Sequence, residues 1–325
     1  MKRRLPLTTL SLVAAFAVLG DALGMYRPEL RTLCGGIAMV CGIAFLIQSF
    51  VDPTHFAGEM QDRVGFSVFA YFSLALLYLA PYAKDYFVGY SAKKLFWVAL
   101  IAHGILTLFT LFRFLRERGK IALQPTSLLY FVGIAAIGDT AAAFDLIAFG
   151  RIFFTVGLIA ALGLYTLLLR QHLLDRKKER RTEARNTPGS VADKTIAVEK
   201  NKHVSKQLDI TLVAPVGILL AAYSPLFSNT TPLFFFLFGA TIVLWGVSVW
   251  RIFFLFVKPF SADLLLSAFP FAISALALQR ANSLVPYISV VRLLMPWVSL
   301  IAVLLATILC YLLLLRLLWR LVGGK

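Results

Sequence analysis

Cysteine, histidine and acidic residues are all scarce in this chain. Its 325 residues include three cysteines, four histidines and 16 aspartates and glutamates. The cysteines show no spacing that suggests a disulfide framework or a metal site, so we interpret them as small apolar packing residues. We therefore expect neither a resident metal ion nor any other cofactor.

Motifs of the common catalytic sites are missing as well. The sequence contains no Gly-x-Ser-x-Gly elbow, no phosphate loop and no His-Glu-x-x-His pair. An enzyme embedded in a membrane usually needs a cluster of acidic residues to hold a metal ion and a diphosphate, and the loops offer only isolated acids. We therefore expect that the protein is not an enzyme, and a membrane-embedded enzyme is the weakest of the alternatives.

Long apolar runs, in contrast, fill almost the whole chain, which is 60% hydrophobic. A helix needs about 20 mostly apolar residues to cross the hydrocarbon core of a membrane. We predict an all-α integral membrane protein, with residues 1–325 in one transmembrane domain. The ten predicted spans are Leu5–Leu23, Thr32–Val51, Val64–Ala83, Lys94–Leu115, Thr126–Ala148, Gly150–Leu173, Asp209–Phe227, Thr231–Val257, Ala262–Asn282 and Val290–Leu318. They form pairs with short links, which predicts five helical hairpins around an axis.

Basic residues dominate the charge, with 32 lysines and arginines and a net charge of +16. With both termini in the cytoplasm, the inner side carries roughly three times as many bases as the outer side, as membrane topology requires. Residues 174–208, which include the basic run Arg176–Arg181, are predicted to be a disordered cytoplasmic linker between spans six and seven. The basic residues lie where the positive-inside rule places them, and the chain has no soluble basic domain. We therefore do not expect nucleic acid as a partner.

The N-terminal region has two interpretations. Basic residues at Lys2–Arg4, followed by an apolar stretch that ends near Gly24, resemble a secretory signal. Its removal would leave nine spans and put the C-terminus outside, against the positive charge of Arg316 and Arg320. We therefore interpret this stretch as the first membrane span.

Prolines distinguish the odd-numbered spans from the even-numbered ones, apart from Pro296 near the start of the tenth. Pro6 opens the first span, Pro215 interrupts the seventh and Pro270 interrupts the ninth. A proline invites a kink, and the backbone groups that a kink frees are tolerated in a membrane only where protein or water satisfies them. We expect these prolines to mark the odd helices as the lining of a cavity. No proline lies between Val64 and Ala80 of the third span or between Ser127 and Ala148 of the fifth. We therefore expect a lining less regular than a five-fold ring of kinked helices.

Four short segments carry a resemblance to a known group of membrane proteins. They are Lys258–Ala262, which leads to Ser267–Pro270 in the ninth span, Leu212–Pro215 in the seventh, and Leu167–Leu173 before the linker. Together with the order of the spans, they make the chain similar to the tellurite-resistance/dicarboxylate transporter family over essentially its whole length. The resemblance implies ten helices in five hairpins, a central pore lined by the odd helices, and a homotrimer in the inner membrane of a bacterium.

The resemblance also implies a gate. In this family a phenylalanine of the ninth helix plugs the pore of each protomer, and the matching position here is Phe269, with Phe271 as the runner-up. Without the resemblance, both are ordinary core or lipid-facing aromatics in a chain with 28 phenylalanines. The expected function is a channel or transporter for small anions, such as chloride, nitrate, a dicarboxylate, sulfite or tellurite. Membrane lipid is the other expected partner.

Asp139 lies in the middle of the fifth span, where an unpaired charge costs about 2.5–3.5 kcal/mol. Three alternatives follow. The carboxyl is protonated and couples the substrate to a proton, or it pairs with a base such as Arg280 or Arg251, or it caps a helix break near Gly138. The first alternative favours a proton-coupled carrier of a C4-dicarboxylate such as malate, or of sulfite, because a coupled carrier needs protonation of Asp139 and a channel does not.

Overall fold

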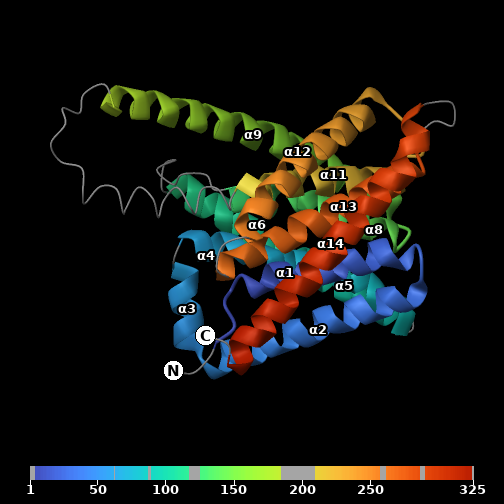
Figure 1. The fold of residues 1–325 in the computed structure, drawn as a ribbon. Helices are drawn as coiled ribbons and strands as arrows, with labels where there is room; N and C mark the ends of the chain where they lie inside the picture. The colour runs from blue at the N-terminus through green and yellow to red at the C-terminus, as the bar shows by residue number, and fades with distance from the viewer. Residues whose placement is uncertain are drawn as a thin grey trace.

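The structure is a computed structural model that describes residues 4–61, 63–86, 89–116, 125–183, 209–256, 261–285 and 290–323. Within these ranges every regular element is an α-helix or a short 3-10 helix, which confirms the predicted all-α class (Figure 1). The elements in chain order are α1 (Thr9–Gly24), α2 (Pro28–Val51), α3 (Pro53–Gln61), α4 (Arg63–Val68), α5 (Ala70–Tyr86), α6 (Gly89–Arg116), η1 (Pro125–Ser127), α7 (Leu128–Val132), α8 (Ile134–Ala142), α9 (Ile147–Glu183), η2 (Asp209–Leu212), α11 (Val213–Leu226), α12 (Pro232–Phe256), η3 (Ala262–Ser267), α13 (Ala268–Asn282) and α14 (Val290–Val322).

Seven helical segments of the described chain are long and apolar enough to cross a membrane. Three further apolar segments, Thr9–Gly24, Leu128–Ala142 and Ile210–Leu226, have 17 residues or fewer, whereas a crossing helix usually has about 20. The chain is therefore an all-α, multi-pass membrane protein. Helix length alone does not fix how many times it crosses.

Five helices form a closed inner ring. Helix α1 packs against α5, α5 against α8, α8 against α11, α11 against α13, and α13 again against α1. We call these five helices the inner ring. These helices are far more buried than the others. In Ala262–Asn282, which contains α13, 89% of the most apolar stretch is buried. In Ile147–Arg170 of α9, only 17% of the most apolar stretch is buried.

The other long helices surround this ring. Each inner helix packs against the long helix that follows it, so that α1 pairs with α2, α5 with α6, α8 with α9, α11 with α12 and α13 with α14. The outer helices expose large apolar side chains, including Phe50 (83% exposed), Leu293 (74%) and Trp250 (69%). Such surfaces are stable where the surroundings are lipid. Helix α1, by contrast, has apolar residues all round between Leu12 and Gly20, as expected of a stretch that is buried on all sides.

The inner ring closes between segments far apart in the sequence. The hydroxyl of Ser11 on α1 donates a hydrogen bond to the carbonyl of Leu266, at the entry to α13, at 3.4 Å. On the other side of α1, the hydroxyl of Tyr82 on α5 donates to the Ala17 carbonyl at 2.6 Å. Hydrogen bonds of this kind add to the van der Waals packing that holds membrane helices together.

Glycines bring α8 and α9 unusually close. A Cβ atom at Gly138 would lie 2.7 Å from the Gly150 carbonyl oxygen, and one at Gly157 would lie 2.7 Å from the Cβ of Ala135. Real Cβ atoms essentially never come within 3.0 Å of another heavy atom. Small residues at a helix crossing let two backbones approach in a membrane. These glycines therefore set the spacing of the α8–α9 hairpin.

A break or turn precedes each inner helix. The 3-10 helices η2 and η3 lead into α11 and α13, and turns at Phe69 and Gly133 precede α5 and α8. Pro215 and Pro270 lie in the first turn of their α-helices, where a missing N–H costs little. Pro6 precedes α1 and lies at the start of the turn that leads into it, where its carbonyl accepts the Thr9 N–H at 3.0 Å. The third and fifth spans are broken at Phe69 and Gly133 although neither break is at a proline, since Pro81 of the third span lies well inside α5.

The boundaries of the fifth and sixth spans differ from the prediction. The fifth span ends at Ala142, and Asp145 in the following turn has a φ of 62°, so the next helix begins at Ile147 instead of Gly150. Helix α9 then continues to Glu183 and extends beyond the other helices in Figure 1. Residues 174–183 of the predicted linker are therefore helical, and its remainder, 184–208, lies outside the described residues.

Helix α3 has no counterpart among the predicted elements, because Pro53–Gln61 is too polar and too short to register as a span. It holds the segment that leads into α1. The Glu59 carboxylate accepts the Leu7 N–H at 3.0 Å, and the Gln48 side chain of α2 accepts the Leu5 N–H at 2.8 Å. Polar side chains thus satisfy backbone donors that precede the first inner helix.

Candidate functional site

The side chain of Phe269 reaches across the interior of the inner ring. It is the second residue of α13 and is 0% exposed. Its ring makes an edge-on contact with Tyr71, at 5.4 Å between centroids, and lies 6.3 Å from the ring of Tyr78. Both tyrosines are on α5, which is separated from α13 in the ring by α1. The contact between their side chains therefore crosses the space that the five helices enclose.

Phe269 and the second candidate for the gate, Phe271, lie on different faces of α13. Tyr71 and Tyr78 are seven residues apart, about two turns, and so lie on one face of α5. Phe271 is also buried, but it lies about 200° further around α13 than Phe269. The position that the resemblance assigns to the gate is the one that meets the α5 tyrosines.

Near the other end of α13, Arg280 forms an ion pair with Asp139 of α8. The Asp139 side chain is 3% exposed, and the same Arg280 Nη1 donates to the Ala221 carbonyl of α11 at 3.1 Å. Of the three alternatives predicted for Asp139, pairing with a base is the one that the structure contains. Eleven residues, about three turns, separate Phe269 from Arg280. Both side chains therefore leave the same face of α13, about 16 Å apart along its axis.

A second set of ion pairs joins the first two hairpins. Arg31 of α2 donates from Nε to Asp21 of α1 at 3.0 Å, and its Nη1 pairs with Asp85 of α5. The same guanidinium lies over the ring of Tyr82, 4.4 Å from its centroid. This stacking adds a cation–π attraction to the two ion pairs. One arginine thus connects three helices at the same end of the bundle as Arg280.

These charged residues surround a small cavity that we call the vestibule. Its volume is ≈ 170 Å³, and its lining consists of Asp21, Arg31, Tyr78, Pro81, Asp139, Thr140, Ala143 and Arg280. The lining residues come from the C-terminal parts of α1, α5, α8 and α13, from the turn after α8 and from the start of α2. The vestibule therefore lies at one end of the inner ring.

Tyr78 connects the vestibule with Phe269. Its ring lies against Phe269, and its hydroxyl is close enough to the Asp139 carboxyl to interact with it electrostatically. Neither that hydroxyl nor Asp139 Oδ2 is within hydrogen-bond geometry of a partner in the described part of the chain. A hydroxyl donor and a carboxylate acceptor therefore remain for water or an ion in the vestibule.

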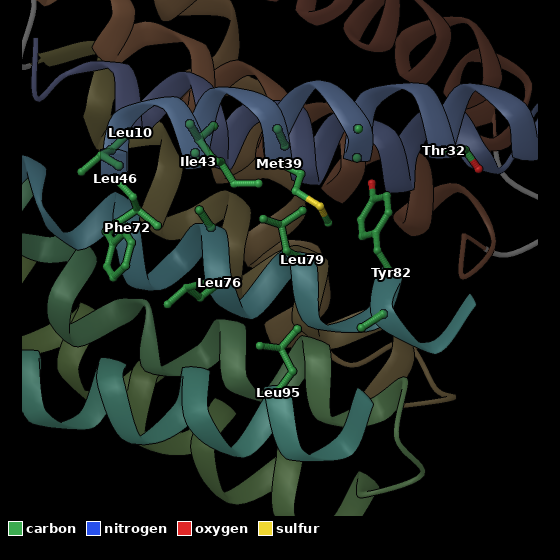
Figure 2. Close-up of a pocket in the computed structure, with 17 residues that line it drawn as sticks. Leu10, Thr32, Met39, Ile43, Leu46, Phe72, Leu76, Leu79, Tyr82 and Leu95 are labelled. Atoms are coloured by element: carbon green, nitrogen blue, oxygen red, sulfur yellow. The ribbon is translucent and has the colours of Figure 1, made fainter. Parts of the chain in front are cut away.

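A larger cavity of ≈ 600 Å³ lies between α1, α2 and α5, and none of the 17 residues that line it is charged. Figure 2 shows apolar side chains of α2 and α5 facing one another across it, with Leu95 of α6 at its edge. Met39 and Ile43, on its α2 side, are each 50% exposed, so the cavity opens toward the surface that faces lipid. Apolar walls offer an ion nothing in place of its hydration. The vestibule is the better candidate for a functional site.

No protein-family model and no curated protein sequence matches the chain. The family resemblance therefore rests on the short segments quoted above. Of these, residues 258–260 lie outside the described residues, whereas Ala262–Pro270 forms η3 and the start of α13. Among the residues that the structure describes, no group of three or more His, Cys, Asp or Glu side chains is placed to hold a metal ion.

The sequence predictions missed part of this site. Tyr71 and Tyr78 have a spacing that puts them on one helix face, but nothing in the sequence says which helix that face meets. Asp21 and Arg31 flank the short link between the first two spans, so a tight hairpin could have predicted their ion pair.

Proposed function

We propose that the protein is a transmembrane channel or transporter that passes small anions along the axis of the inner ring, with Phe269 as the gate. The observation that carries the proposal is the contact of Phe269 with Tyr71 and Tyr78 across the ring interior. An apolar ring across a narrow path breaks the water column and leaves an ion without hydration. Conduction then requires the Phe269 ring to rotate away.

In this proposal ten helices cross the membrane as five hairpins, and the protein belongs to the tellurite-resistance/dicarboxylate transporter family. The packing of each inner helix on the following outer helix supports the hairpins. With the 3-10 turns that precede them, two of the short helices become Pro125–Ala142 and Asp209–Leu226, within the usual range of about 17–25 residues. The burial of all but the last turn of α1 in the ring supports its assignment as a span rather than a removable signal.

The proposed orientation puts both termini in the cytoplasm of a bacterial cell, with the protein in the inner membrane as a homotrimer. The excess of bases in the inner loops supports this orientation, and the trimer follows from the family resemblance. The C-terminal ends of the inner helices then face outward, so the vestibule opens to the outer side. Chloride, nitrate, sulfite, tellurite or a dicarboxylate would meet Arg31 and Arg280 there before reaching Phe269.

A proton-coupled carrier of malate or another C4-dicarboxylate, or of sulfite, is the second candidate. The observation that favours it is Asp139, a buried carboxylate inside the ring whose Oδ2 has no hydrogen-bond partner among the described residues. Proton uptake by this carboxyl would weaken its pair with Arg280 and free the guanidinium for a substrate carboxylate. We do not propose an enzyme, because the sequence carries no catalytic motif.

Anion currents in planar bilayers test the gate, with the parent protein compared with Phe269→Ala and Phe271→Ala. Phe271→Ala is the control: it removes the same type of side chain from another face of α13, so it measures the effect of losing a phenylalanine ring that is not at the gate. We expect Phe269→Ala to raise the chloride current about tenfold or more, which corresponds to a barrier lowered by at least ~1.4 kcal/mol. Phe271→Ala should stay near the parent.

Equal currents from the two variants would contradict the assignment of Phe269 as the gate. A different result favours the carrier: no variant conducts, while reconstituted vesicles take up malate or sulfite in response to a pH gradient. In that case Asp139→Asn should abolish the uptake, because the amide cannot take up the coupling proton.

A further inference from the structure

We propose that the vestibule binds one small monovalent anion between the guanidinium groups of Arg31 and Arg280, with the Tyr78 hydroxyl as a further donor. This site rests on the proposed function, because it is where an anion waits on the vestibule side of the Phe269 gate. All three side chains line the same cavity.

Each of the three groups has a donor to spare. Both hydrogen bonds of Arg280 in the described chain leave from Nη1, so its Nε and Nη2 have no protein acceptor there. Arg31 uses Nε for Asp21 and Nη1 for Asp85, which leaves Nη2. The Tyr78 hydroxyl, on a residue only 1% exposed, lies beside the Asp139 carboxyl but is not within hydrogen-bond geometry of it or of any other partner in this part of the chain. The spare nitrogens of the two guanidinium groups are open to the vestibule, and a buried hydroxyl without a partner is costly, so a bound anion with its waters is the acceptor that this arrangement fits.

The charge balance around the vestibule predicts weak binding. Three carboxylates and three cations lie in it or beside it: Asp21, Asp85, Asp139, Arg31, Arg280 and Lys84, whose Nζ donates to the Ala143 carbonyl at 2.7 Å. Their formal charges cancel, so the cluster lacks the excess positive charge that would hold a divalent anion firmly. A monovalent anion held by donors in a neutral cluster can also leave, which conduction requires.

The volume of the vestibule agrees with a small ion. A cavity of ≈ 170 Å³ has room for a chloride or nitrate ion together with several waters. The waters bridge the ion to those donors that it does not contact directly. Gluconate is monovalent but much bulkier than chloride, so it serves as the reference anion in the experiment below.

Asp139 competes with the anion for Arg280. Asp139→Asn removes the negative charge but keeps a carbonyl acceptor, so the released guanidinium should hold chloride more tightly. We expect the half-saturating chloride concentration to fall about tenfold, equivalent to ~1.4 kcal/mol. The double variant Asp139→Asn with Arg280→Gln should lose saturable binding. It is preferred to Arg280→Gln alone, which would leave Asp139 charged and unpaired in the interior and endanger folding.

The test measures the midpoint of thermal unfolding of the purified full-length protein in detergent. Chloride replaces gluconate stepwise at constant ionic strength, because an anion that binds only the folded state raises the midpoint. We expect a saturable rise for the parent, the same rise at about tenfold lower chloride for Asp139→Asn, and none for the double variant. A midpoint that does not depend on chloride in any protein, or equal half-saturation in all three, overturns the site. Tighter saturation by succinate than by chloride overturns the monovalent assignment.

Currents in the Phe269→Ala background separate this inference from the proposed function. The half-saturating chloride concentration of the current should fall when Asp139→Asn is added. Chloride currents whose half-saturation is the same with and without that change refute the site and leave the channel standing. Chloride-dependent midpoints without current in any variant refute the channel and leave the site standing.

Discussion

Replacing Gly157 with alanine should force α8 and α9 apart, because the position has no room for one methyl group. The new Cβ would lie 2.7 Å from the Cβ and 2.9 Å from the backbone nitrogen of Ala135. Ordinary contacts of a Cβ begin at 3.4 Å, so the helices must separate by about 0.7 Å, the difference between 3.4 and 2.7 Å. A gap of this size costs neighbouring atoms about a quarter to a half of their attraction.

Gly163→Ala is the matched control for this change. Gly163 lies on the same helix, and a Cβ there would meet nothing within 4 Å. Alanine stabilises a helix by about 0.5–1 kcal/mol relative to glycine, and both variants share this gain. Overpacking typically costs about 1–3 kcal/mol, so Gly157→Ala should be less stable than Gly163→Ala by about that amount.

The free energy of unfolding in mixed detergent micelles, followed by circular dichroism, measures this difference. Both variants should have the same helix content as the parent before unfolding, since neither change lies at a helix end. If Gly157→Ala and Gly163→Ala have equal stability, the backbones of α8 and α9 are not in the close contact described here. The reasoning from the glycine positions would then be refuted.

Two further changes have defined outcomes. Tyr82→Phe removes the hydroxyl that donates to the Ala17 carbonyl, and the free energy of unfolding should fall by about 0.6 kcal/mol and by no more than ~1.7; an unchanged value would contradict this bond. Asp52, between α2 and α3, accepts the His55 N–H and the Thr54 hydroxyl, which lowers its pKa from the ordinary 3.8. Because folded Asp52 gives up its proton more readily than unfolded Asp52, its contribution to stability is complete above that ordinary value and is lost as the pH falls through the folded pKa. Asp52→Asn should therefore be less stable than the parent at neutral pH, with the gap closing in acid, and a gap that does not change with pH would refute this.

The apolar segments could be predicted from the sequence because length and hydrophobicity are local properties. Helix α1 ends one residue beyond the span predicted at Leu5–Leu23 and begins four residues later than predicted, after a turn that was not anticipated. Breaks in the inner helices were predicted only where a proline signals them. The turns at Phe69 and Gly133 have no proline to mark them.

The site depends on which helices pack against one another, and a single sequence does not reveal these neighbours. The cost of a buried carboxylate made a partner for Asp139 necessary, but Arg251 satisfied that argument as well as Arg280 did. The structure decides between them with a pair 141 residues apart in the sequence. The meeting of Phe269 with Tyr71 follows in the same way from the arrangement of α5, α1 and α13 in the ring.

Closure of the ring by α1 and α13 determines when the fold can be completed. The bond between Ser11 and Leu266 joins residues 255 positions apart, so no partial chain that stops before α13 can enclose α1. Contacts between such distant segments form slowly, since a long loop must be ordered before they contribute. A nascent chain that ends after α12 therefore contains four inner helices and an open seam beside α1. The first helix to be synthesised is among the last to be fully enclosed.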